Sequence, residues 1–78
     1  MPKIVPINYK KLVQVFEKDG FQVSRTKGDH ISMTKLGILR PVVIKTSPHN
    51  VAVTHIRTNL TTAGISRDRY FELLEKVK

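Results

Sequence analysis

Two short segments that alternate apolar and polar residues stand on either side of a glycine, and this pattern predicts a β-hairpin. The segments are 21–27 and 31–35, and Gly28 lies between them. A glycine supplies the backbone freedom that a tight turn requires. The hairpin constrains the chain strongly, because one of its faces must be covered by other elements before it becomes stable in water.

The register of this hairpin depends on the length of its turn. A two-residue loop at 28–29 would place Val23 on the polar face of the second strand. A three-residue loop ending at His30, or a bulge beside the turn, places Val23 on the face of Met33 instead. We therefore expect an irregular turn with His30 in it or at its edge.

A third strand is expected at 38–45, after a turn at Leu36-Gly37. Its run 42–44 is apolar throughout, which indicates burial on both faces. Pro41 lacks an N–H and belongs at an edge or a bulge. The segment 51–53 is apolar but short, and its pattern fits either a loop or a fourth strand.

Three helices are predicted, each with a capping residue: Asn8 for the first, which ends at Gly20, Thr54 for the second, and Ser66 for the third. Apolar residues at helical spacing define their buried faces. These are Tyr9, Leu12, Val13 and Phe16, then Ile56, Leu60 and Ala63, and finally Tyr70, Leu73, Leu74 and Val77. The order α-β-β-β-α-α predicts an α+β fold, a three-stranded antiparallel sheet with helices on one face, in a single domain over residues 1–78.

The net charge of the chain narrows the range of candidate functions. Lysine and arginine total 14 and the acidic residues total 6, so the net charge is +8. Such a surface suits a polyanion, with nucleic acid the first candidate, although charge also serves solubility alone. The chain has no cysteine, and no stretch reaches the length of a membrane span. Residues 1–6 have no long apolar run, so we expect that they are not a signal peptide. We expect a cytoplasmic protein with no cofactor, and no metal, because the three histidines lack the spacing of a ligand motif.

Several motifs in order give the chain a family resemblance. They are the opening Pro2-Lys3-Ile4, the helix end Lys18-Asp19-Gly20-Phe21, the turn Gly28-Asp29-His30, and the closing segments 54–66 and 70–74. With these motifs the chain resembles the HicA toxins of type II toxin–antitoxin systems. Those toxins are mRNA interferases with a fold like the double-stranded-RNA-binding domain. The resemblance implies an mRNA substrate and a protein antitoxin of the HicB type as partner.

The resemblance also implies a catalytic residue. His30 takes the position of the family's histidine, and Gly28 and Asp29 complete the turn that carries it. The chain departs from the family pattern at Asp29, where serine is usual, and around Lys45, where the family has a further histidine. His49, a few residues on, is a candidate substitute.

Metal-free RNA cleavage requires a base for the 2′-hydroxyl proton, an acid for the leaving oxygen, and cations near phosphorus. Histidine ordinarily titrates near pH 6.5 and suits the role of base, and Asp29 can orient its ring. RNA contacts are expected from six residues: Arg25, Lys27, Lys45, His49, Lys10 and Lys11. Lys45 and His49 are also the candidates for the acid. A non-catalytic double-stranded-RNA-binding-like domain and a basic adaptor for an acidic protein remain as alternative functions.

Overall fold

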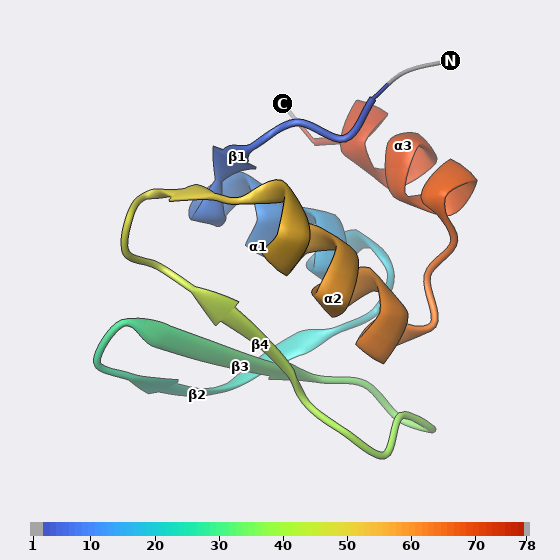
Figure 1. Ribbon diagram of the computed structural model, residues 1–78. Coiled ribbons are helices and arrows are strands. Elements are labelled where there is room, and N and C mark those ends of the chain that lie inside the picture. Colours follow the sequence, from blue (N-terminus) through green and yellow to red (C-terminus); the bar gives the residue numbers. More distant parts are fainter. Residues whose placement is uncertain (1–2, 78) are drawn as a thin grey trace.

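The computed structural model describes residues 3–77. Its elements follow the order β1 (Ile7–Asn8), α1 (Tyr9–Lys18), β2 (Gln22–Lys27), β3 (His30–Thr34), β4 (Val42–Lys45), β5 (Asn50–Val51), α2 (Val53–Ala63) and α3 (Arg67–Glu75). Strands β2, β3 and β4 form an antiparallel sheet in that order. All three helices lie on one side of this sheet, and its other side is open (Figure 1). The predicted α+β class, with its three-stranded antiparallel sheet and three helices, is confirmed.

Local signals explain where two of the helices begin. The Asn8 side chain accepts a hydrogen bond from the backbone N–H of Lys10, and the Ser66 side chain accepts one from Arg69. Both caps were predicted, and each satisfies a backbone donor that the helix itself leaves free. The prediction for α2 was wrong: Thr54 lies inside the helix, whose N-cap is Ala52 and has no side-chain cap.

A second, two-stranded sheet was not predicted as such. Strands β1 and β5 pair antiparallel, with Ile7 opposite Val51. The ambiguous segment 51–53 therefore divides, since Val51 ends β5 and Val53 begins α2. The backbone N–H of Tyr9 also donates to the carbonyl of His49 at 2.8 Å, which ties the start of α1 to this part of the chain.

The β2–β3 hairpin is regular at its turn and irregular within β2. Lys27 pairs directly with His30, so the turn is a two-residue loop and not the predicted irregular turn, and His30 lies at its edge as the first residue of β3. The bulge lies between Val23 and Arg25. Val23 nevertheless lies on the face of Met33, as predicted, and pairs with it, because the extra residue in β2 restores the register farther from the turn.

The core lies between the helices and the inner face of the sheet. Met33, Val42 and Ile44 are fully buried on that face. The prediction that β4 is buried on both faces was wrong, since Val43 points to the open side and is 43% exposed. In α1 the buried stripe is Leu12, Val15 and Phe16, so Val15 belongs to the core although the predicted stripe omitted it.

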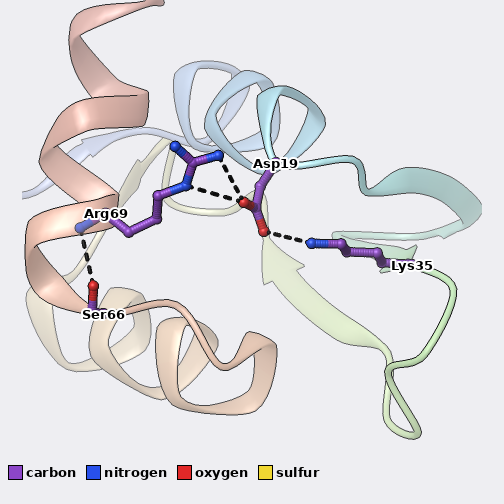
Figure 2. A network of polar contacts seen from close by, with 4 residues as sticks. All are labelled: Asp19, Lys35, Ser66 and Arg69. Atoms are coloured by element: carbon purple, nitrogen blue, oxygen red, sulfur yellow. Dashed lines mark hydrogen bonds and ion pairs between the residues drawn. The ribbon is translucent and has the colours of Figure 1, made fainter.

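One carboxylate joins three elements at the edge of the core. Asp19 at the end of α1 accepts from Lys35 Nζ at 3.1 Å, and from Nε and Nη2 of Arg69 at 3.3 Å (Figure 2). Its side chain is only 12% exposed, so water screens these contacts less than it screens surface pairs. The network holds α3 and the end of β3 against α1. None of the helices in the described part of the chain is long and apolar enough to cross a membrane.

Candidate functional site

Three side chains form a row across the open face of the sheet. His30 pairs with Lys27 of β2 on one side and with Lys45 of β4 on the other. Directly opposed residues in antiparallel strands share a face, and their Cβ atoms are about 4.5–5.5 Å apart. The face is the one opposite the core, because the neighbouring residue Ile31 pairs with the fully buried Ile44. His30 therefore lies between two lysine residues on an open surface.

The next row of the same face adds another cation. Arg25 pairs with Ser32, which in turn pairs with Val43. Since residues two apart in a strand lie on the same face, this row runs beside the first. The guanidinium of Arg25 suits a phosphate, which it binds through two parallel hydrogen bonds. Ser32 contributes a hydroxyl that sequence reasoning did not single out, and its signal is the predicted alternation of this strand.

The His30 ring contacts the carboxylate of the residue before it. Its Nδ1 atom lies 2.9 Å from Oδ1 of Asp29. A carboxylate at this distance favours a hydrogen on Nδ1, which leaves the lone pair of the neutral ring on Nε2. The side chains of His30 and Asp29 are 52% and 48% exposed, so a large substrate can reach them.

The backbone around His30 and Asp29 is fixed at two points. Gly28 adopts φ +56°, a value that disfavours residues with a Cβ atom. The carbonyl of Asp29 accepts from the backbone N–H of Thr46 at 2.8 Å, which ties the turn to the end of β4. In the family pattern Thr46 takes the place of the further histidine, but its side chain gives no signal for this contact, which is made by the backbone.

Three of the six predicted RNA contacts lie outside these rows. Lys10 and Lys11 are exposed in the first turn of α1, which belongs to the helical layer. The His49 ring lies near the ring of Tyr9, with the two centroids 6.1 Å apart. Within residues 3–77, no hydrogen bond or ion pair joins His49 to His30.

The side chains around His30 suit an anion and not a metal ion. Over residues 3–77, no group of three or more histidine, aspartate or glutamate side chains is arranged to hold a metal ion. The polar groups around His30 are ammonium, guanidinium and hydroxyl groups, apart from the single carboxylate of Asp29. These are groups that bind and stabilise an anion.

Comparison with known families decides the relationship of the chain. The family model for the HicA toxin of bacterial toxin–antitoxin systems matches residues 9–65. The chain belongs to the HicA toxin family. No curated protein and no solved structure gives a significant match.

The matched range of the HicA family covers every residue of the two rows, and it also includes the turn at Gly28. It ends before α3 begins at Arg67. Membership of this family makes the chain the toxin of a toxin–antitoxin pair, and an antitoxin is therefore its partner. The open face carries Arg25, Lys27 and Lys45, whose charge suits a polyanion.

Proposed function

We propose that this HicA family member is an endoribonuclease, an mRNA interferase that cleaves RNA without a metal ion and uses His30 as its base. The observation that carries the proposal is the row in which His30 lies between Lys27 and Lys45. A proton acceptor flanked by two cations, and open to a macromolecule, is the arrangement that phosphodiester cleavage requires.

The base is the Nε2 atom of His30. Asp29 occupies the Nδ1 side of the ring at 2.9 Å, and this contact supports the tautomer with a free lone pair on Nε2. In the proposed reaction Nε2 takes the proton of a ribose 2′-hydroxyl, and the 2′-oxygen attacks the adjacent phosphorus. A bond forms between this oxygen and phosphorus while the bond from phosphorus to the 5′-oxygen breaks. The products are a 2′,3′-cyclic phosphate and a 5′-hydroxyl end.

The two lysines complete the chemistry. Negative charge builds on the phosphoryl oxygens during the attack, and positioned cations stabilise it more in the transition state than in the ground state. Lys27 and Arg25 are assigned this role. Lys45, directly opposite His30, is the candidate donor of the proton that the leaving 5′-oxygen takes up. We prefer Lys45 to His49 because the ring of His49 packs near Tyr9 instead.

The antitoxin is proposed to be a HicB-type protein that covers the same open face. A protein that neutralises the toxin must keep RNA from His30, and acidic side chains complement Arg25 and Lys27. Toxin and antitoxin would then meet in the cytoplasm, where mRNA is found. RNA and antitoxin should therefore compete for the toxin.

The test is a cleavage assay on end-labelled RNA with His30→Ala and Asp29→Asn, each with and without EDTA. We expect the wild type to cleave in EDTA and to leave cyclic phosphate ends. His30→Ala should lower the rate by about a hundredfold or more, the usual contribution of a general base. Asp29→Asn should cause a smaller loss, because it leaves the base in place and removes only the group that orients it.

The control is Glu72→Ala, a change on the exposed surface of α3, which should leave the rate unchanged. Circular dichroism of every variant verifies that the fold persists. Unaltered cleavage by a folded His30→Ala protein would refute the assignment of the base. Salt-sensitive RNA binding with no products from the wild type would favour the non-catalytic RNA-binding alternative.

A further inference from the structure

A small cavity lies beside the row that contains His30. Its volume is about 120 Å3, below the roughly 300–1,000 Å3 of pockets that take drug-sized ligands. It is built where the loop after β4 meets β5 and the first turn of α2. The residues that line it include Lys45, Ser47, Pro48, Asn50, Ala52 and His55.

Lys45 connects this cavity to the candidate site. It borders the cavity and also pairs directly with His30 across β3 and β4. A molecule held in the cavity would therefore lie next to any phosphate bound between His30 and Lys45. Because the nucleotides of an RNA chain are covalently joined, the occupant that fits this neighbourhood is another part of the same RNA.

Apart from Lys45 and His55, the lining favours a base over a second phosphate. Pro48, Val51 and Ala52 supply an apolar part of the wall, and Val51 is only 3% exposed. A phosphate buried against an apolar surface loses its hydration and gains no hydrogen bonds from that surface, whereas the flat face of a base loses little hydration free energy. Asn50 adds an amide with both donor and acceptor atoms, which is the combination that the edge of a base requires.

We propose that this cavity binds the base of an unpaired nucleotide adjoining the cleaved phosphate, and so selects the sites at which the RNA is cut. The proposal rests on the proposed function. A base enters a pocket of this kind only when it is splayed out of its stack, as in single-stranded loops and ends. The substrate class is accordingly RNA that is unpaired at the cut.

The test is to cleave a randomised RNA pool with the wild type and with two cavity variants, and to sequence the ends of the fragments. The wild type should enrich one base beside the cut by about fivefold to a hundredfold, the range of one base-edge contact. Asn50→Ala removes the amide and should lower this enrichment. Ala52→Leu fills the cavity from an exposed position and should abolish it. Gln22→Ala, an exposed amide at the far end of the sheet, is the matched control and should preserve it.

Failure of this inference differs from failure of the proposed function. If cleavage depends on His30 but no base is enriched, or if both cavity variants keep the wild-type preference, the cavity does not read a base. If the wild type does not cleave at all, NMR titration with the four nucleoside 5′-monophosphates tests the cavity directly. Shifts confined to the backbone amides of residues 45–55 and lost in Ala52→Leu would support the cavity, and the absence of such shifts would overturn it.

Discussion

Two polar side chains of this protein, those of His30 and Tyr70, have opposite environments, and only one of them is accessible to a substrate. The His30 ring has a carboxylate on Nδ1 and a side chain that is 52% exposed. The hydroxyl of Tyr70 is buried, and no hydrogen-bond partner for it exists among residues 3–77. A group with an oriented lone pair at the surface can react with a substrate, whereas a buried hydroxyl without a partner only costs solvation.

The hydroxyl of Tyr70 provides a stability prediction. Tyr70→Phe keeps the packed ring and removes the unsatisfied group, so we expect a gain of about 1 kcal/mol. For a domain of this size, that gain raises the melting temperature by about 4–8 °C in thermal unfolding. A loss of stability in Tyr70→Phe would mean that the hydroxyl is hydrogen-bonded in solution.

The same residue predicts a pH dependence. Burial raises the pKa of Tyr70 above its ordinary value of 10.0, because the apolar surroundings disfavour the phenolate. The folded state therefore holds the phenol proton more tightly than the unfolded state does. This contribution is fully present below pH 10 and is lost as pH rises beyond it. The stability advantage of Tyr70→Phe should accordingly widen above pH 10.

At the scale of elements, the long periodic segments of this chain could be predicted from its sequence, and the short ones could not. The helices α1 and α3 were predictable because amphipathic spacing and a side-chain cap point to the same boundaries. The start of α2 was missed because Ala52 carries no capping group. The two-residue strands β1 and β5 have no periodicity to detect, and their pairing joins segments more than forty residues apart.

The candidate site stays a prediction, and the sequence supplied part of it. His30, Gly28 and the nearby cations were chosen as candidates because their chemistry and the family resemblance both point to them. The alignment of His30 with Lys45 required the register of β3 and β4, in which the partly buried Ile31 pairs with the fully buried Ile44. The bulge in β2 could not be located from the sequence. Every residue of this strand is exposed, so the alternation of apolar and polar residues does not show where the extra residue lies.

The hairpin as an element makes a prediction at Gly28. A Cβ atom at this position would meet no other atom within 4 Å, so Gly28→Ala acts only through the backbone at φ +56°. We expect a loss of about 1–2 kcal/mol in chemical denaturation. RNA cleavage should fall by about tenfold to a hundredfold, since displacement of His30 spoils its alignment.

Gly37 is the matched control. It has φ +91° in the β3–β4 loop, and an added Cβ atom would again meet nothing within 4 Å. Gly37→Ala should therefore cost similar stability while cleavage by the folded protein stays normal. Equal loss of cleavage in both variants would show that activity follows overall stability and not the geometry of the turn.

At the scale of the whole molecule, the two faces of the sheet divide the work. The inner face of the sheet and the helices form the core, so the side chains of the outer face are not packed against the helices (Figure 1). The network around Asp19 uses Lys35 and Arg69 to hold the helical layer, so these cations are occupied with an acidic partner. Arg25, Lys27 and Lys45 lie instead on the open face, where their charge is available to a polyanion.

This division predicts how RNA binding responds to salt. Affinity for RNA in which every 2′-hydroxyl is methylated, and which cannot be cleaved by 2′-oxygen attack, is measured by fluorescence anisotropy at several salt concentrations. Each phosphate contact contributes about 0.7 to the slope of log K against log salt for a single strand. Lys27→Gln and Lys45→Gln should each reduce the slope by about that amount. Lys76→Gln, at the end of α3 in the helical layer, removes the same charge and should leave the slope unchanged. Equal reductions in all three variants would mean that RNA responds to the net charge of +8 and not to the open face.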